Sequence, residues 1–339
     1  MTIGGAIAAD IHGKNHHKEG GFGDHVESLV LATANGDFVQ ASPSENAELF
    51  FATIGGMGLT GVIVEATFRL RPIETGWVRQ TTVVAPHLEA AMAALDEADA
   101  ASYSAAWIDC VAQGCQLGRS LVFLGEHARL DELSNATNGH RYPAISAPHL
   151  SAPFDFPSFI LNQWSIGAFN EIYFRRGARK AGQSNLVPID SFFFPLDSVG
   201  NWNRIYGRQG FIQYQCVIPL ASGLTALSEI LGRIAARGDG SFLSVLKKLG
   251  PSNGLLSFPL AGYTLALDFP IRPELPNFLD ELDGIVAEAS GRLYLAKDAR
   301  QSPAALEAGY PRLRNFREVR RQVDPAGCLR SRLSERLGI

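Results

Sequence analysis

The sequence predicts an α+β fold divided into two parts, and three observations support this prediction. The 339 residues exceed the roughly 100–200 residues of a usual single domain, so two hydrophobic cores are expected. Strand-like alternation of apolar and polar residues recurs along the chain. Two long segments with helical spacing join strands that otherwise dominate the second half, which is typical of an α+β protein.

Composition and charge describe an ordinary globular protein. Apolar residues make up 46% of the chain and charged residues 19%, which excludes a disordered or fibrous class. A net charge of -4 gives no broad positive field, so nucleic acids are poor candidate partners. No apolar run reaches the roughly 18–20 residues that span a bilayer, and no signal peptide is evident. We therefore expect a cytoplasmic protein, or one bound peripherally at the inner membrane.

The first part of the chain is expected to form a small sheet with one helix. Small residues at 2–10 indicate a turn that leads into packed structure, and such an opening indicates that the chain is truncated at its N-terminus. Residues 26–40 alternate around Asn35-Gly36, a pair that favours a hairpin turn. A helix and then a β-branched strand are predicted at 45–52 and 62–70.

A second unit begins near residue 75, after Arg71-Pro72 closes the last of these strands. Residues 138–165 are rich in Pro, Ser and Asn without a clear period, which predicts a long loop and a candidate lid. Strands and helices share the rest of this unit. The predicted strands start at Val78 and cover 104–110, 189–195, 211–218, 241–247 and 263–269, and the predicted helices cover 88–101, 222–237, 275–290 and 311–322.

Two groups of polar residues are candidates for chemistry on residue type alone. The loop 10–17 brings donors, acceptors and a cation after a Gly-Gly turn, and it either approaches a ligand or forms a solvated loop. Gln213 and Gln215 share one face of a predicted strand, where they either hold a ligand or face solvent. No metal is expected, because the loop matches no metal motif and the cysteines lack ligand spacing. The four cysteines, expected to be reduced thiols, are Cys110, Cys115, Cys216 and Cys328.

Several segments together resemble a known family. The segment TIGGAIAADIHGKNHH is similar to the cofactor loop of the vanillyl-alcohol-oxidase superfamily of FAD-linked flavoproteins. Agreement over nearly the whole chain, in the same order, is closest to the branch of decaprenylphosphoryl-ribose oxidases, and it is more specific than any single glycine motif. The agreeing segments are AELFFATIGGMGLTGVI, SAAWID, PLDSVGNWNRIYGRQGFIQYQCVIP, SFLSVLKKLGPSN, LSFPLAGYTLALDFPI, GRLYLAKDAR and VRRQVDP.

The resemblance implies a partial FAD-binding domain of the vanillyl-alcohol-oxidase type and a substrate domain with an antiparallel β-sheet flanked by helices. Under this interpretation residues 1–75 and 292–339 belong to the flavin domain, and residues 76–291 form the substrate domain. The family's N-terminal stretch, which holds the adenine and pyrophosphate of FAD, has no counterpart before Met1. A separate N-terminal segment of the FAD domain is therefore an expected partner.

The resemblance also implies a set of residues beside the flavin. This branch binds FAD without a covalent bond, so His12 is expected to form hydrogen bonds rather than to anchor the flavin. The loop glycines let backbone N–H groups approach the cofactor, although a tight turn alone also explains them. Ile63 lies on an apolar strand and is equally consistent with a core position. The implied cofactor-binding residues are Thr2, Gly4, Gly5, Ala9, His12, Ile63 and Tyr294.

A second set of residues is implied at the substrate. Lys297 matches a family lysine at the substrate and flavin, where a cation stabilises the negative charge of the reduced flavin. An ion pair with Asp298 is the structural alternative for this lysine. Either Lys297 or His12 is the expected base. The implied catalytic residues are Lys297, His12 and Tyr206, and the implied substrate-binding residues are Lys14, Trp107, Gln213, Gln215, Lys297 and Asp268.

The implied reaction is oxidation of the 2'-hydroxyl of a polyprenyl-phosphoryl-β-D-ribose to a 2'-keto sugar, in the synthesis of the arabinose donor for cell-wall arabinan. A short-chain reductase partner would then reduce the ketone, and the lipid tail would bring the chain to a membrane surface. Thr264 and Ala266 replace an Asn and a Cys that the family commonly carries, which implies a smaller, less polar pocket wall. The alternatives are an FAD-dependent alditol or aldonolactone oxidase and a non-catalytic truncated fragment.

Overall fold

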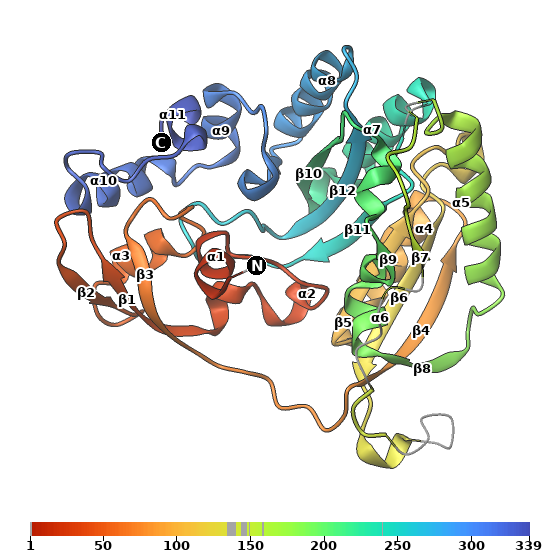
Figure 1. Ribbon diagram of the computed structural model, residues 1–339, viewed down its shortest axis with the longest axis horizontal. Helices are drawn as coiled ribbons and strands as arrows, with labels where there is room; N and C mark the ends of the chain where they lie inside the picture. Colours follow the sequence, from red (N-terminus) through yellow and green to blue (C-terminus); the bar gives the residue numbers. More distant parts are fainter. Residues whose placement is uncertain (1, 134–139, 144–147, 149, 158, 239) are drawn as a thin grey trace.

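The molecule has two lobes, each with its own hydrophobic core (Figure 1). The structure is a computed structural model that describes residues 2–133, 140–143, 148, 150–157, 159–238 and 240–339. The core of the first lobe draws side chains from both ends of the chain, and the core of the second lobe draws them from the residues between. The α+β class predicted from the sequence is confirmed.

The first lobe is built on a three-stranded antiparallel sheet in the order β2-β1-β3. The strands are β1 (Val26–Ala32), β2 (Phe38–Ala41) and β3 (Val62–Phe68). Ala32 pairs with Phe38 across a loop in which Gly36 takes a positive φ, so the predicted hairpin is confirmed. The helices of this lobe are α1 (Ile3–Ala8), α2 (His16–Glu19), α3 (Ala47–Thr53), α9 (Pro303–Gly309), α10 (Leu313–Val323) and α11 (Arg332–Leu337).

The turn predicted for residues 2–10 is wrong, because this segment forms α1. The side-chain oxygen of Thr2 accepts a hydrogen bond from the Gly5 backbone N–H at 3.1 Å and so caps the helix. Ala6 and Ile7 are buried on its inner side. Capping and burial together offset the low helix propensity of the two glycines.

The second lobe is built on one antiparallel sheet of eight strands in the order β13-β10-β12-β11-β5-β6-β4-β8. A separate parallel pair joins β7 (Leu150–Ser151) and β9 (Val199–Gly200). The strands of the large sheet are β4 (Trp77–Ala85), β5 (Tyr103–Ile108), β6 (Ser120–His127), β8 (Ser184–Pro188), β10 (Phe211–Pro219), β11 (Ser244–Leu249), β12 (Gly262–Pro270) and β13 (Arg292–Leu293).

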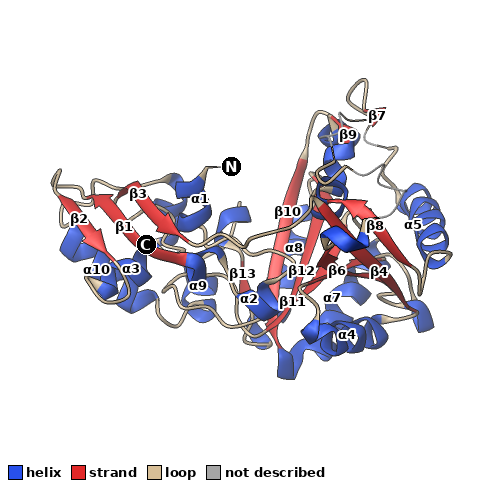
Figure 2. Ribbon diagram, turned by 90° about the horizontal axis from the view of Figure 1, so that it is seen from below, coloured by secondary structure: helices blue, strands red, loops and turns tan. Residues whose placement is uncertain are grey.

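Helices cover the two faces of the large sheet differently (Figure 2). The back face packs into the main core beneath α4 (Leu88–Glu97), α7 (Gly223–Arg237) and α8 (Leu275–Glu288). The front face is covered at the β4 and β6 end by α5 (Gln163–Ala178) and α6 (Ile189–Phe193). The front of β10, β12 and β11 is left facing the first lobe. No helix within the described residues has the length and apolarity to cross a bilayer.

Two predictions in this lobe need correction. The strand predicted at 189–195 is wrong, since α6 begins after Pro188 and the neighbouring strand β8 ends there. The helical turn lets Phe192 and Phe193 both pack edge-on against Tyr103, which a strand would not allow because it points successive side chains to opposite faces. The loop predicted at 138–165 ends in α5, which was not expected. Residues 138–139, 144–147, 149 and 158 of that loop lie outside the described residues.

The division of the chain into three segments stays a prediction. Leu293 of β13 contributes to the main core, whereas Leu295 two residues later belongs to the core of the first lobe. Leu256, from the connection between β11 and β12, also lies in the core of the first lobe. We keep boundaries near residues 75 and 291 as a proposal that these packing changes support.

Candidate active site

The strand pairing brings the predicted polar residues onto the front face of the large sheet. Gln213 of β10 lies opposite Asp268 of β12. Gln215 lies opposite Ala266, and Ala266 in turn lies opposite Val245 of β11. Alternate residues of a strand share a face, so three neighbouring strands present their polar side chains to the first lobe.

Gln213 and Asp268 form one polar pair of this face. The Gln213 amide N–H donates to Asp268 Oδ1 at 2.9 Å. Asp268 is 3% exposed, and burial raises its pKa to about 6, although Gln213 and the Lys297 cation act in the opposite direction. A carboxyl group with this pKa holds a proton or releases one close to neutral pH.

Gln215 and His12 connect the sheet to the loop of the first lobe. His12 Nε2 lies 2.9 Å from the Gln215 amide nitrogen, which also donates to the Thr264 hydroxyl at 2.9 Å. The Gln215 amide oxygen is buried and has no hydrogen-bond partner among the described residues. An unpaired buried amide oxygen is costly on its own, so it is a ready acceptor for a ligand hydroxyl or N–H group.

Lys247 of β11 completes this network and was not predicted. Its Nζ lies 3.1 Å from His12 Nδ1. Burial, together with Lys297 and Lys14, lowers the pKa of Lys247 to about 7. Burial and the nearby Lys247 hold the pKa of His12 well below its ordinary value of 6.5, so the imidazole is neutral. A neutral Lys247 accepts a hydrogen bond from Nδ1–H, which leaves Nε2 free to accept from Gln215.

The sequence contains a signal for Lys247 in its alternation. On one face of β11 it stands between Val245 and Leu249, and a lysine between two apolar neighbours on a strand face is unusual. The next residue, Lys248, points to the opposite side and binds Asp96 and Asp99. Because side chains alternate along β11, Lys247 faces His12, whereas Lys248 forms ion pairs on the other side of the sheet.

Lys297 approaches the same space from the short helix η9 (Leu295–Lys297), which follows β13. Burial lowers its pKa, and Asp268 raises it. The alternative of an ion pair with Asp298 does not fit the geometry, since the Asp298 carboxylate accepts hydrogen bonds from Arg336 at 2.7 Å and from two backbone N–H groups. Lys297 thus remains available to a ligand.

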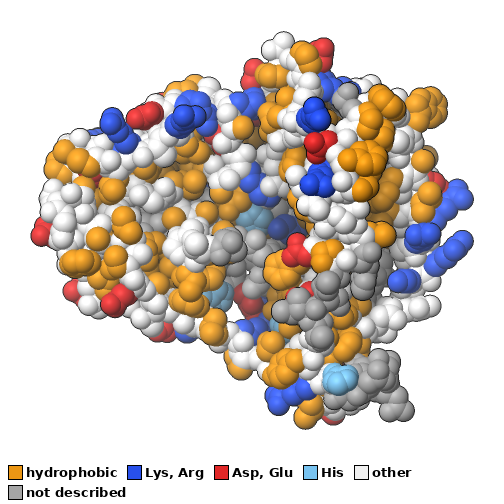
Figure 3. All heavy atoms as spheres, viewed as in Figure 1, with side chains coloured by type: hydrophobic (Ala, Val, Ile, Leu, Met, Phe, Trp, Pro, Cys, Tyr) orange, Lys and Arg blue, Asp and Glu red, His pale blue; other side chains and the backbone are white. Residues whose placement is uncertain are grey.

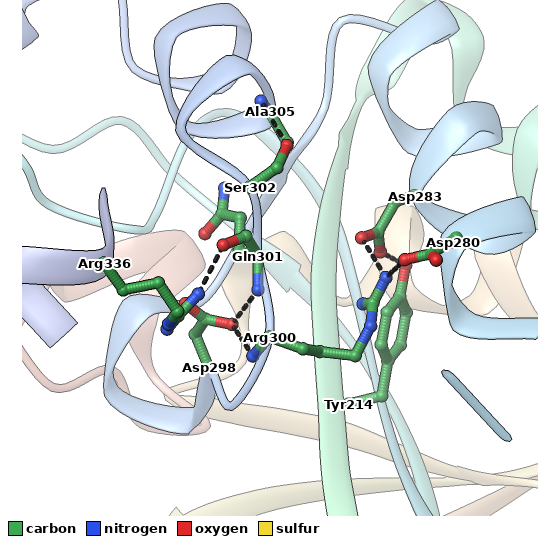
Figure 4. Close-up of polar contacts among 9 residues, drawn as sticks. All are labelled: Tyr214, Asp280, Asp283, Asp298, Arg300, Gln301, Ser302, Ala305 and Arg336. Carbon is green, nitrogen blue, oxygen red and sulfur yellow. Dashed lines mark hydrogen bonds and ion pairs between the residues drawn. The ribbon is translucent and has the colours of Figure 1, made fainter. Parts of the chain in front are cut away.

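The segment that follows Lys297 is fixed on both sides (Figure 4). Asp298 is held by Arg336 of α11, while the Arg300 side chain reaches toward α8 and binds Asp283 at 2.8 Å and Asp280. Tyr214, on the back of β10, donates to the same Asp283 carboxylate at 3.1 Å. These contacts position the backbone from which Lys297 extends.

Lys14 lies at the edge of the site. Its Nζ donates to the backbone carbonyl of Phe192 in α6 and stands 4.4 Å from the centre of that ring. Burial lowers its pKa to about 8. The structure therefore places this predicted substrate residue between the loop of the first lobe and α6, within electrostatic reach of Lys247.

Aromatic side chains form the wall beside the polar face. Trp107 of β5 lies opposite Val245, donates its indole N–H to Phe242 O at 3.2 Å, and packs 4.7 Å from the Tyr173 ring. Tyr206 stacks on Phe242 at 5.6 Å. Its hydroxyl is buried without a hydrogen-bond partner in the described part of the chain, and burial and the Asp268 carboxylate raise its pKa.

The residues predicted at the flavin divide into two groups. Tyr294 stacks on Phe258 at 4.5 Å and donates its hydroxyl to the Ala9 carbonyl at 3.3 Å, with His12 5.5 Å away, so these lie together. Thr2 caps α1, and Gly4 and Gly5 lie within this helix. Ile63 packs against the core of the first lobe.

The donor set fits a flavin together with an anionic, hydroxyl-rich substrate. His, Lys and Arg side chains gather in the hollow between the lobes (Figure 3). Lys247 and Lys297 both lie within electrostatic reach of His12, and Lys297 also lies within electrostatic reach of the Asp268 carboxylate. Cations beside unpaired amide and hydroxyl groups suit negative charge and hydrogen-bonding ring atoms. The site residues could thus hold such a group, and their individual roles stay predictions.

Comparison with known proteins identifies the family. The chain is 39% identical, over 99% of its length, to the decaprenylphosphoryl-beta-D-ribose oxidase of Mycolicibacterium smegmatis, of which it covers 74%. The chain belongs to the decaprenylphosphoryl-ribose oxidase family. It is also 34% identical over its whole length to an uncharacterised protein of Streptomyces coelicolor, of which it covers 93%. Residues 267–337 match the D-arabinono-1,4-lactone oxidase family model.

Membership makes the chain a flavin-dependent oxidoreductase, as the sequence predicted. The region matched by the lactone oxidase model includes both Asp268 and Lys297, and it crosses from the large sheet to the helices of the first lobe. The family resemblance and the geometry therefore converge on the same part of the molecule.

Proposed function

We propose that the chain oxidises the 2'-hydroxyl of a polyprenyl-phosphoryl-β-D-ribose to a 2'-keto sugar. The observation that carries the proposal is the convergence of amides and cations on one sheet face, in a chain 39% identical over 99% of its length to an oxidase whose name states this substrate. Amide groups suit sugar hydroxyls, and lysines suit a phosphodiester. The ketone would pass to a separate reductase, on the way to an arabinose donor.

The amides and Asp268 would orient the sugar ring. The unpaired oxygen of Gln215 would accept a hydrogen bond from a sugar hydroxyl, and the Gln213–Asp268 pair offers both a donor and an acceptor. Lys14, at the entrance beside α6, is placed to meet the phosphate. The aromatic wall of Trp107 and Tyr206 would exclude water from the ring face.

Lys297 is our choice of base. A bound flavin would supply the acceptor for the hydride that leaves the carbon carrying the hydroxyl. The Lys297 amine, whose pKa burial lowers, takes the hydroxyl proton and becomes a cation beside the new negative charge. His12 has partners at both ring nitrogens, so it is better suited to position Gln215 and Lys247 than to receive a proton.

We also propose that FAD is held without a covalent bond. The His12 ring nitrogens contact Gln215 and Lys247, which leaves neither nitrogen directed only at a ligand. Acid precipitation of the FAD-loaded protein tests this point. Flavin in the supernatant is expected, and flavin retained in the pellet contradicts it.

Anaerobic flavin reduction tests the function. The FAD-loaded chain is mixed with a polyprenyl-phosphoryl ribose, and loss of the oxidised flavin absorbance is followed. Bleaching by the ribose lipid, but not by the same lipid lacking the 2'-hydroxyl, is expected. Protein that binds FAD but stays oxidised with the ribose lipid contradicts the proposal.

The match to D-arabinono-1,4-lactone oxidase favours a second candidate, oxidation of a soluble alditol or aldonolactone. The match covers 267–337 only, whereas the resemblance to the ribose lipid oxidase extends over nearly the whole chain. The same assay separates the two candidates, because bleaching by small polyols alone supports the second. Bound flavin that no substrate reduces would favour a non-catalytic role.

A further inference from the structure

A cavity of about 150 Å³ lies where the connection between β11 and β12 meets the residues that precede α10. Its wall is largely apolar, with Pro259 and Leu260 from the connection and Pro311 from the first lobe. Two arginines also line it, Arg292 of β13 and Arg312, and we call it the arginine cavity. A single water needs only about 10–15 Å³ of such space. None of the residues predicted at the flavin or the substrate lines this cavity, so it is separate from the candidate active site.

Arg292 leaves most of its hydrogen-bond donors unused. Its Nη1 donates to the Ser257 carbonyl at 3.0 Å, and its guanidinium stands 5.1 Å from the centre of the Tyr310 ring. Its Nε is buried and has no hydrogen-bond partner among the described residues. A guanidinium carries five N–H donors, and a buried donor without an acceptor is costly. The remaining donors are therefore available to an acceptor in the cavity.

Other arginines that lie partly inside the molecule are paired with carboxylates. Arg119 binds Asp109 at 2.8 Å, and Arg300 binds Asp283 at the same distance. Within the described residues, by contrast, Arg292 donates only to a backbone carbonyl and forms no ion pair. A cation that leaves water without a carboxylate partner is destabilising. An anion from outside the chain would remove this cost.

Arg312 and α10 add to the positive potential of the arginine cavity. Arg312 donates to the backbone carbonyls of residues 252–254 and to no carboxylate in the part of the chain that the structure describes. Burial lowers the pKa of Arg292, Tyr310 raises it, and the Arg312 cation lowers it further. Helix α10 begins at Leu313, directly after Arg312, so the positive end of its dipole lies beside the cavity. Three sources of positive potential thus meet at one opening.

We propose that the arginine cavity binds a phosphate group, either free or as the end of a small phosphorylated molecule. A phosphate dianion would neutralise both guanidinium groups, whereas a carboxylate would neutralise only one. Its oxygens would accept from the unused N–H groups of Arg292 and Arg312. The apolar wall strengthens these contacts because it limits screening by water. The proposal does not depend on the proposed function.

A phosphate group in this position would stabilise the contact between the lobes. Ser257, whose carbonyl Arg292 holds, donates its hydroxyl to the buried carboxyl group of Asp10 in the first lobe. The next residue, Phe258, stacks on Tyr294 at 4.5 Å. Fixing Arg292 would therefore fix the connection between β11 and β12 on both the cavity side and the side of the candidate active site. We expect a higher melting temperature when the cavity is occupied.

Thermal unfolding and titration calorimetry of the full chain test the site at pH 7.5. Inorganic phosphate at roughly 100 times its dissociation constant should raise the melting temperature by about 2–5 °C. Sodium chloride at equal ionic strength should not, and sodium acetate should bind at least about tenfold more weakly than phosphate. Glycerol 3-phosphate distinguishes the two sources, because tighter binding than inorganic phosphate identifies a phosphorylated molecule and weaker binding identifies the free ion.

A matched pair of variants on one helix locates the binding. Arg312→Gln should weaken phosphate binding at least about tenfold, because a charge-assisted hydrogen bond is lost. Arg314→Gln removes an equal charge from an exposed position that does not line the cavity, and it should bind phosphate as the parent does. Equal binding of phosphate and acetate, or equal binding by the parent and Arg312→Gln, would overturn the proposal.

Because the arginines also hold the connection in place, a second pair of variants keeps them both. Ala261 is exposed and lines the cavity, so Ala261→Glu brings a carboxylate beside the guanidinium groups. This variant should melt at a higher temperature than the parent without phosphate and bind phosphate at least about tenfold more weakly, and Ala261→Gln should do neither. Identical behaviour of the two variants would contradict the proposal. Loss of phosphate binding once FAD is bound would also contradict it, because the cavity would then belong to the cofactor.

Discussion

The two faces of the large sheet differ although the same three strands build both. On the front of β10, β11 and β12 stand amides, a carboxyl group and Lys247, and on the back stand side chains such as Leu246 and Leu265 that are fully buried. Because strand residues alternate, each polar side chain of the front face is adjacent in sequence to a core side chain. The comparison teaches that substitutions one residue apart can test the proposed site and the core separately.

Two neighbouring lysines make the contrast concrete. For Lys247, burial and the cations Lys297 and Lys14 lower the pKa to about 7. For Lys248, burial also opposes the charge, but hydrogen bonds to Asp99 and Asp96 outweigh it and raise the pKa. The surroundings of Lys247 favour its neutral amine, whereas the carboxylates beside Lys248 favour its cation.

The largest expected effect comes from removing Lys297, the proposed base. Lys297→Met should slow anaerobic flavin reduction about 1000-fold, because roughly 4 kcal/mol of transition-state stabilisation is lost. The melting temperature should change little, since Lys297 is only partly buried. Stopped-flow reduction of FAD-loaded protein measures the rate. Lys248→Met is the control, and equal slowing in both variants would refute the assignment.

Shortening a side chain on the back face should lower the stability of the protein without slowing flavin reduction. Leu265→Ala is expected to lower the free energy of unfolding by about 2–5 kcal/mol, because it opens a cavity among fully buried neighbours. The reduction rate per folded molecule should stay unchanged. Urea unfolding measures the free energy of unfolding. The control is Val245→Ala, at a half-buried position on the front face, which should lower this free energy by less than half as much. A similar cost in both variants would mean that the faces do not differ in packing.

Much of this architecture follows from the sequence. The hairpin, the strands β10 and β12, and the helices α7 and α8 have apolar spacing that matches their burial. Helix α5 escaped prediction because Asn170 is buried on its inner side beside Ile166 while Trp164, Phe169 and Ile172 are exposed, so its apolar residues do not mark a core-facing stripe. The strand predicted at 189–195 failed for a related reason, since a run of three phenylalanines fits either a buried strand or a tight helical turn.

The candidate site shows the same limit. Gln213 and Gln215 were assigned to one face correctly because a strand's alternation is a local property. The contact between His12 and Lys247 joins residues 235 positions apart, and no local pattern encodes such a pairing. Its apolar flanks mark Lys247 as unusual, but only the folded sheet shows which partner it meets.

A smaller effect, set by pH, distinguishes the two lysines. The unfolded chain keeps the ordinary lysine pKa near 10.5, so below pH 7 both states of Lys247 hold the proton and its full desolvation cost destabilises the fold. Between pH 7 and 10.5 the unfolded state binds more protons, and stability rises with pH. Lys247→Met should therefore raise the melting temperature at pH 6, with a gain that shrinks toward pH 10.

The matched variant, Lys248→Met, should shift the melting temperature in the opposite direction. The raised pKa of Lys248 means that its ion pairs stabilise the fold at neutral pH, and this contribution is lost as pH rises through that pKa. Lys248→Met should therefore lower the melting temperature at pH 6 and 7, modestly because Asp96 and Asp99 are exposed. Thermal melts of both variants from pH 6 to pH 10 make the measurement. A higher melting temperature in both variants, or a gain in Lys247→Met that does not vary with pH, would contradict this account of Lys247.

The smallest expected effect concerns the hydroxyl behind Gln215. Thr264→Val removes the oxygen that accepts from the Gln215 amide and that donates to the Cys216 carbonyl at 2.8 Å, while keeping the volume of the side chain. Loss of these neutral hydrogen bonds should cost about 1–2 kcal/mol of stability. Because the contact to His12 survives, Gln215 stays in place and KM should rise less than about tenfold with kcat nearly unchanged. Steady-state kinetics with the ribose lipid measure both constants. A large fall in kcat would instead mean that Thr264 and Lys247, which lie opposite each other on β12 and β11, act together on the reacting atoms. The effects of substitutions on the front face would then not be additive.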